Sequence, residues 1–454
     1  MKFLSFCKSG EEATPSRTDN GGCRGPSAGG DRHQTHSHRY IEATTMNASS
    51  LRLRPMSLPS TTTALAAAAL VGAACATSST PSPEPGPATQ SVAAPVMPDR
   101  DYLVYVVAES ADEIALVRFG PNGGAVDHRL TTGIMPADVD GPHGVAVSPD
   151  GRYYYVSIAH GTPYGTVWKY TTHGDTLKGR VELGNFPATM QTTPDGEFLY
   201  VVNFNLHGDH VPSSVSVVAT EPMVEVARTT TCTMPHGSRV NAQGTKHYSA
   251  CMMDDMVVEI DTRTFGAARH FMVTKGKEHG EAGPPHRMAG GQRHDMAGHG
   301  TTGATPGDDA CSPTWAQPSA DGSKVFVACN KASDIVEIDV ANWTMSRRIP
   351  AGPGVYNLAV TRNGRLLIGT NKRGQSVSII DIASGRELAR VPTKRKFVHG
   401  AVVSPDDRYL FVSVEGVGSE PGTVEVIDLA SFKTLATVDV GQQAGGIDFW
   451  KTEP

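Results

Sequence analysis

The sequence predicts an all-β fold, a seven-bladed β-propeller with four antiparallel strands per blade. The first observation is segment 399–441, where apolar and polar residues alternate between turn signals in four short runs rich in β-branched residues. The second is that this pattern recurs at a spacing of about 42 to 45 residues, which is typical of propeller blades. One such sheet cannot close its own core, so the copies must pack together.

The repeated unit starts with an apolar strand, a turn of the Pro-Asp-Gly type and a second strand rich in Tyr, Phe or Leu. It reads HGVAVSPDGRYYYVS at 143–157, MQTTPDGEFLYVVN at 190–203, QPSADGSKVFVACN at 317–330 and LAVTRNGRLLIGTN at 358–371. The third strands end at Asp261, Asp339, Asp381 and Asp428. Gly and Asp in the turns and apolar residues between them predict hairpins throughout the repeat.

Complete units begin near six positions, which are Pro142, Pro187, Pro235, Pro313, Val355 and Val398. Two fragments remain. Segment 101–141 supplies a second, third and fourth strand, and segment 444–451 supplies a first strand. We expect the C-terminal strand to join the N-terminal blade, because this closure removes the open sheet edges of the ring.

The N-terminal region is predicted to lie outside the propeller, which occupies 101–454. Residues 1–45 are disordered or untranslated, 46–76 form a signal peptide, and 77–100 are a Ser/Thr/Pro linker. The signal peptide has Arg52 and Arg54 ahead of an apolar run at 64–74, and Cys75 ends a sequence similar to a lipoprotein box, although Gly72 stands where Leu is typical. The protein is therefore expected to be periplasmic or secreted, with membrane contact only through a lipid anchor at Cys75.

Short sequences at the ends of the second strands resemble the YVTN-repeat, or surface-layer-like, family of seven-bladed propellers. They are Tyr-Val-Val-Asn at 200–203 and Leu-Ile-Gly-Thr-Asn at 367–371. The resemblance covers 101–454, extends to the related lactonase-like propellers, and implies a secreted or periplasmic protein. It indicates architecture more strongly than activity, because one propeller shape hosts binding proteins, lactonases and redox enzymes.

Three histidines fall at one equivalent position when the blades are aligned on their turns. His143, His236 and His399 each precede the first strand of a blade and are expected at the mouth of the central channel. Converging neutral imidazoles are suitable ligands for zinc or copper. The alternative is that each imidazole only caps a backbone carbonyl.

Further candidate metal ligands lie in loops on the same predicted face. An insertion at 270–310 between the fourth and fifth blades is rich in Gly and Pro and is expected to be a loop. Imidazole and thioether together favour copper over zinc, and the alternative is a solvated loop of biased composition. The candidates are His160, His207, His210, His270, Met272, His279, His286, Met288, His294, Met296 and His299.

Four cysteines lie within the propeller, and their spacing around two turns predicts two disulfides. Cys232 would pair with Cys251, and Cys311 with Cys329, across two-strand hairpins. A thiolate metal site near His236 remains the alternative.

Several functions can be weighed from these residues. The net charge of −6 gives no reason to expect a nucleic acid partner, and the chain has no Cys-x-x-Cys-His sequence for covalent haem c. The favoured prediction is a binding or scaffold protein with a copper-type site at the channel mouth, and the sequence leaves open whether the protein is an enzyme. The alternatives are a lactonase-like hydrolase using these histidines with Glu415 and Arg239, a metal-dependent oxidoreductase, and a scaffold that binds a small molecule or a protein without metal.

Overall fold

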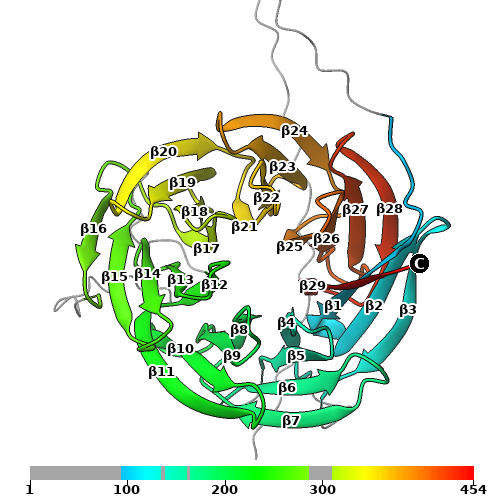
Figure 1. Cartoon of the computed structure of the whole chain (residues 1–454), viewed down its shortest axis with the longest axis horizontal. Helices are drawn as coiled ribbons and strands as arrows, with labels where there is room; N and C mark the ends of the chain where they lie inside the picture. The colour runs from blue at the N-terminus through cyan, green and yellow to red at the C-terminus, as the bar shows by residue number, and fades with distance from the viewer. Residues whose placement is uncertain (1–93, 134–138, 161–163, 286–308) are drawn as a thin grey trace, which may run out of the picture. The chain divides into compact units, whose positions relative to one another are not determined.

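A computed structural model describes residues 94–133, 139–160, 164–285 and 309–454 of the chain. Seven antiparallel sheets follow one another around a central axis, which confirms the predicted seven-bladed propeller (Figure 1). The first strand of each blade lies innermost (Figure 1). Among the described residues no helix has the length and hydropathy needed to cross a membrane.

The blades are numbered from the N-terminus. Blade 1 contains β29 (Ala444–Glu453), β1 (Asp101–Ala108), β2 (Glu113–Gly120) and β3 (Gly123–Thr131), and blade 2 contains β4 (Pro142–Val147), β5 (Tyr153–Ile158), β6 (Thr166–Thr171) and β7 (Leu177–Glu182). Blade 3 contains β8 (Pro187–Thr192), β9 (Phe198–Asn203), β10 (Pro212–Ala219) and β11 (Val224–Thr233), and blade 4 contains β12 (Pro235–Val240), β13 (Lys246–Cys251), β14 (Met256–Asp261), β15 (Ala267–Met272) and β16 (His279–Ala282).

Blade 5 contains β17 (Pro313–Pro318), β18 (Lys324–Cys329), β19 (Asp334–Asp339) and β20 (Thr344–Pro350), and blade 6 contains β21 (Val355–Val360), β22 (Leu366–Asn371), β23 (Ser376–Asp381) and β24 (Arg386–Pro392). Blade 7 contains β25 (Val398–Val403), β26 (Tyr409–Val414), β27 (Thr423–Asp428) and β28 (Lys433–Asp439). The innermost strands of blades 2 to 7 begin at the six predicted unit starts.

The two ends of the propeller meet in blade 1. β29 pairs antiparallel with β1, from Asp101 opposite Glu453 to Ala108 opposite Ala444. The predicted closure is confirmed, and the C-terminal strand is longer than the segment expected. Tyr102 of β1 packs edge-on against Tyr409 of blade 7, with ring centroids 5.0 Å apart, so apolar burial also joins the last blade to the first.

Strand burial follows position within the blade. The second and third strands are buried on both faces because neighbouring blades cover them, whereas an outer strand such as β3 or β7 alternates between exposed and partly buried residues.

The turn after the first strand explains the Pro-Asp-Gly signal. In blade 2 the Asp150 carboxylate accepts hydrogen bonds from the Ser148 hydroxyl and the Arg152 N–H, and Gly151 has φ of 68°.

A left-handed residue precedes every innermost strand and turns the chain toward the channel. The residues at this position all have φ between 49° and 69°, and they are Gly141, Phe186, Met234, Ser312, Gly354, Phe397 and Gln443. Five of the seven are not glycine, although the left-handed region favours glycine. The same backbone geometry in all seven blades places the following residues at equivalent depths in the channel.

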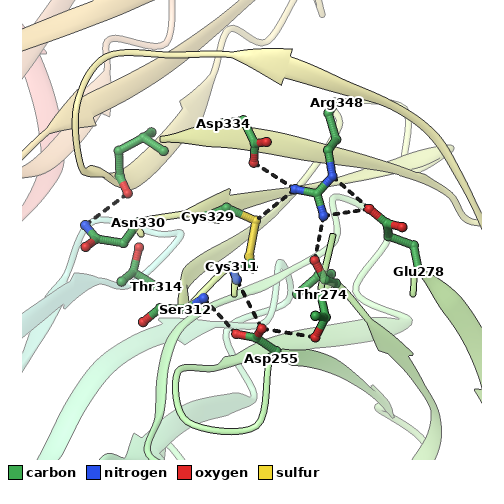
Figure 2. The surroundings of a disulfide bond; sticks show 12 residues. Asp255, Thr274, Glu278, Cys311, Ser312, Thr314, Cys329, Asn330, Asp334 and Arg348 are labelled. Atoms are coloured by element: carbon green, nitrogen blue, oxygen red, sulfur yellow. Dashed lines mark hydrogen bonds and ion pairs between the residues drawn. A yellow bond between two sulfur atoms is a disulfide. The ribbon is translucent and has the colours of Figure 1, made fainter. Parts of the chain in front are cut away.

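Both predicted disulfides are present. Cys311–Cys329 links the segment before β17 to the end of β18 within blade 5, whereas Cys232–Cys251 links β11 of blade 3 to the end of β13 in blade 4. Around the second disulfide, the Asp255 carboxylate accepts the backbone N–H groups of Cys311 and Ser312 (Figure 2). Arg348 of β20 forms ion pairs with Asp334 and Glu278 on the other side of the bond (Figure 2).

The structure differs from the predicted loop at the start of the His/Met insertion. Residues 270–272 complete β15, and β16 adds a fifth strand at the outer rim of blade 4 (Figure 1). β16 pairs antiparallel with β15, and its Gly280 lies against Trp343 of blade 5, where a Cβ atom would be 2.1 Å from the indole. Glu278 fixes the connection to β16 through Arg348 at 2.7 Å. Residues 286–308 lie outside the described ranges.

Candidate functional site

The second residue of each innermost strand points into the channel at one level. Three of these residues are the predicted histidines. The full set, in order from blade 1 to blade 7, is Gly445, His143, Ala188, His236, Thr314, Tyr356 and His399. Large rings therefore come from blades 2, 4, 6 and 7, and small residues come from the other three.

The four large rings contact one another and form what we call the aromatic belt, consisting of His143, His236, Tyr356 and His399. Ring centroids are 6.3 Å apart for His143 and His236, and 5.2 Å apart for His236 and Tyr356. They are 5.0 Å apart for Tyr356 and His399, and 5.6 Å apart for His399 and His143. Each belt residue is at most 9% exposed. The three predicted histidines are thus brought together as expected.

Hydrogen bonds distinguish the belt histidines from one another. His236 uses both ring nitrogens, since Nδ1 lies 3.0 Å from the Thr314 carbonyl oxygen and Nε2 lies 2.9 Å from the Tyr356 hydroxyl. In contrast, Nε2 of His143 and Nδ1 of His399 are buried without a hydrogen-bond partner. A buried nitrogen without a partner is costly in a folded protein, so these two atoms are candidates for binding a ligand.

A second set of equivalent residues follows the second strand of each blade and lies next to the belt. In order from blade 1 to blade 7 the set is Glu109, Ala159, Phe204, Met252, Asn330, Lys372 and Glu415. Three of the seven are charged, and they come from the consecutive blades 6, 7 and 1. The chain thus delivers both sets to one face, as the blade alignment predicted.

The Glu109 corner joins one carboxylate to two imidazoles. Glu109 begins the short 3-10 helix η1 (Glu109–Ala111), and its Oε2 lies 2.6 Å from Nδ1 of His143. Its Oε1 lies 2.6 Å from Nε2 of His160, which follows β5. Burial alone would raise the pKa of Glu109, but the charges and hydrogen bonds of the two histidines hold that pKa well below its usual range. The hydrogen bond to Glu109 raises the pKa of His160.

The Glu415 corner pairs its carboxylate with an ammonium group instead. Lys372 Nζ lies 2.6 Å from Oε1 of Glu415 and 4.5 Å from the ring centroid of Tyr356. His399 Nε2 is 3.9 Å from the same carboxylate oxygen. Burial, together with the Lys372 charge, holds the pKa of His399 well below 6.5, and burial lowers the pKa of His236 to about 3. Both imidazoles are therefore neutral at pH 7.

One wall of the site is made by Phe186 and two further predicted histidines. The Phe186 ring lies 5.2 Å from His143, 5.0 Å from His160 and 5.6 Å from His207 between centroids. His160 and His207 are 5.4 Å apart. The wall is an apolar ring flanked by imidazoles, a surface suited to the ring of a small ligand.

The remaining metal-ligand candidates do not join this cluster. His210 is exposed on the loop after His207. His270 is buried in β15, with Nδ1 3.1 Å from the Gly283 carbonyl oxygen, while Met272 packs on the core between blades 3 and 4, and His279 is exposed in β16. His286, Met288, His294, Met296, His299 and Cys75 lie outside the described residues. Within the described ranges, no group of three or more His, Cys, Asp or Glu side chains is arranged to hold a metal ion.

The structure also revises the residues suggested for acid/base chemistry. Arg239 lies over the Trp315 ring at 4.3 Å and donates to the Ser238 carbonyl, so it has a packing role. Glu109, Lys372 and Tyr356 were not singled out as site residues in the sequence. Glu109 and Lys372 occupy the same position in their blades as Glu415, so an alignment on the ends of the second strands would have found them.

Comparisons with known proteins agree with the fold. A family model described as a seven-bladed β-propeller lactonase matches residues 95–211. Antigen Lp49 of Leptospira interrogans is 34% identical over 79 residues, which amount to 15% of this chain and 17% of that protein. The match therefore spans about a sixth of this curated relative.

Similar solved structures include proteins named as lactonases and one named as hydrazine synthase. The periplasmic gluconolactonase PpgL of Pseudomonas aeruginosa is 17% identical, with a TM-score of 0.55 over 77% of this chain and 99% of that chain. A putative 6-phosphogluconolactonase from Bacteroides uniformis is 13% identical, with a TM-score of 0.54 over 77% and 99%. Hydrazine synthase from Kuenenia stuttgartiensis is 19% identical, with a TM-score of 0.52 over 68% and 91%. At these identities the similarity establishes the fold alone.

Proposed function

We propose that this protein hydrolyses lactones at the mouth of its central channel. The observation that carries the proposal is the pairing of Glu109 with His143, which leaves Nε2 of His143 buried and without a partner. The segment matched by the lactonase family model, 95–211, contains both residues as well as His160 and Phe186. The proposal therefore replaces the binding scaffold, favoured from sequence, with one of its alternatives.

The Glu109 carboxylate sets the tautomer of His143. Because a carboxylate only accepts hydrogen bonds, Nδ1 of His143 carries a proton, and in the neutral imidazole that the reaction needs the lone pair is therefore on Nε2. Nε2 can then take a proton from a water molecule as that water attacks the lactone carbonyl carbon. The imidazolium, stabilised by Glu109, returns the proton to the ring oxygen as the carbon–oxygen bond breaks, and the product is a hydroxy acid. Such a carboxylate–imidazole pair works by the same logic as in serine hydrolases.

Lys372 supplies positive charge on the other side of the belt. Its ammonium is held by Glu415 and lies over the Tyr356 ring, both at fixed distances. The buried surroundings oppose its charge, but Tyr356 and Glu415 more than compensate and raise the pKa of Lys372. A fixed cation in a partly buried site stabilises the negative oxygen that forms when water adds to the carbonyl.

The location of the protein is part of the proposal. Two disulfides, Cys232–Cys251 and Cys311–Cys329, are typical of an oxidising compartment. We therefore infer that the protein acts outside the cytoplasm. The signal peptide predicted at 46–76 lies outside the described residues.

The test is a pH-stat assay of purified protein with a panel of five- and six-membered lactones. We expect ring opening above the buffer rate for at least one lactone, and its loss in His143→Gln, which keeps a donor for Glu109 but provides no base. His210→Gln is the matched control, because it changes an exposed histidine on the next loop of the same face. A panel without hydrolysis would reject the proposal in favour of a non-catalytic scaffold.

A further inference from the structure

We propose that the aromatic belt also binds one Cu(I) ion, held between Nε2 of His143 and Nδ1 of His399. These are the two belt nitrogens that are fully buried and lack a hydrogen-bond partner, and their residues are 8% and 5% exposed. The two rings are neighbours, with centroids 5.6 Å apart. Gly445, at the belt position between them, adds no side chain, and a Cβ atom there would lie 3.3 Å from the His143 carbonyl oxygen and 4.0 Å from Cε1 of His399.

The other ring nitrogen of each histidine faces a carboxylate, and that of His143 is hydrogen-bonded to it. Glu109 lies 2.6 Å from Nδ1 of His143, and Glu415 lies 3.9 Å from Nε2 of His399. Metal-bound histidines commonly donate their second N–H to a carboxylate, which fixes the ring and makes the free nitrogen a better ligand. The His143 side of the belt therefore already has the outer contact of a metal site before any ion binds, and Glu415 lies near the other side.

Hydrogen bonds occupy both ring nitrogens of His236, the third belt histidine, so neither is free to bind an ion. Nε2 of His236 accepts the Tyr356 hydroxyl, and Nδ1 faces the Thr314 carbonyl. Two ligands do not satisfy Zn²⁺, which takes four. Cu(I) accepts two nitrogen ligands, and its single charge is less costly to bury than a double charge. The sequence-based prediction of a three-histidine site thus becomes a two-histidine site for a monovalent ion.

A bound ion would occupy the same lone pair of His143 that the proposed hydrolysis uses. We therefore expect Cu(I) to inhibit lactone hydrolysis by this protein. The binding claim does not rest on the hydrolytic one, because binding is measured directly and survives even if no lactone is a substrate.

The experiment is an anaerobic titration of full-length protein into the Cu(I)–bicinchoninate complex, whose absorbance falls as the ion is transferred. The chain has other His and Met residues that could compete for Cu(I), so the result is the difference between the wild type and His143→Gln/His399→Gln. We expect a loss of one equivalent per chain in that variant and no loss of that equivalent in the control His210→Gln/His279→Gln, which changes two exposed histidines outside the site. Equal uptake by the wild type and the belt variant would overturn the site. A thermal unfolding curve for each variant checks that the variant is folded.

Two further variants test the contacts around the ion. Glu109→Gln should weaken this equivalent about 10- to 100-fold, as expected when a second-shell carboxylate is lost. Tyr356→Phe frees Nε2 of His236 and should tighten binding and change the X-ray absorption spectrum from two to three nitrogen ligands. Unchanged affinity in both variants would contradict the placement of the ion in the belt.

Discussion

The Glu109 and Glu415 corners of the channel mouth are built on equivalent positions of two blades, but their carboxylates contact different partners. Both carboxylates directly follow the second strand of a blade, and the two blades are neighbours. Glu109 bonds two imidazoles at 2.6 Å each, whereas Glu415 bonds an ammonium at 2.6 Å and is 3.9 Å from His399. A single choice of partner therefore makes one corner suited to moving a proton and the other suited to holding a positive charge.

The difference also separates histidines that look alike in sequence. His143 and His399 both follow the first residue of an innermost strand and precede Gly. Only His143 has a carboxylate at hydrogen-bonding distance, which fixes its tautomer. His399 lies beside the Lys372 charge, which with burial disfavours its protonation. In the proposed reaction, His143 alone is therefore the general base.

The largest expected effect is on the rate of hydrolysis. His143→Gln should lower kcat about 10²- to 10⁴-fold, the usual contribution of a general base. His399→Gln should lower kcat less, because this imidazole does not take the proton. Steady-state rates with one lactone substrate compare the two variants directly. Equal losses would remove the distinction between the corners.

Reduction of the disulfides should lower the free energy of unfolding without changing the difference between the two corners in their effect on kcat. Each bond closes a loop with a sequence separation of 19 or 18 residues, and such a loop contributes about 3 kcal/mol to the free energy of unfolding. Urea unfolding with and without reductant measures this change. At a temperature where the reduced protein stays folded, kcat should be unaltered, since both corners belong to blades without disulfides.

Lys372→Met should have a smaller effect on stability and should act on one corner only. It leaves the partly buried Glu415 without its main partner, at a cost of about 1–3 kcal/mol in the free energy of unfolding. The double variant Lys372→Met/Glu415→Gln should recover part of that loss, and urea unfolding of both variants provides the test. If the single variant were as stable as the wild type, the Lys372–Glu415 pair would not matter to the fold.

The smallest effect is expected from Arg239→Met. The guanidinium packs on Trp315, a contact worth about 0.5–2 kcal/mol in stability, and it belongs to neither corner. The turnover number should stay within about twofold of the wild type, because a packing residue contributes little to transition-state binding. A large loss of kcat at unchanged stability would show that Arg239 takes part in the reaction and does not act only through packing.

The fold was predictable because aligning the repeated turns shows where each strand of a blade begins. Every innermost strand of blades 2 to 7 begins where the turn alignment placed it, at residues such as Pro142 and Val398. The same alignment put His143, His236 and His399 at one level. The disulfides followed from the positions of four cysteines around two turns, and they are confirmed.

The site was only partly predictable because its function depends on partners that lie far apart in sequence. Glu109 and His143 come from different blades, and nothing in the sequence shows which carboxylate reaches which ring. Similarly, the Tyr356 hydroxyl removes His236 from the free ligands, and only the hydrogen bond at 2.9 Å reveals this. The start of the His/Met insertion was expected to be a loop because Gly and Pro are frequent there. It instead contains a strand that pairs with β15 and lies against Trp343.

The most direct measurement compares kcat for Glu109→Gln and Glu415→Gln on the same lactone. Glu109→Gln should lower kcat at least about 10²-fold, because the amide no longer fixes the proton on Nδ1 of His143 or stabilises the imidazolium. Glu415→Gln should lower it no more than about tenfold, since Lys372 keeps its charge. A larger loss in Glu415→Gln than in Glu109→Gln would contradict the assignment of the base to the Glu109 corner.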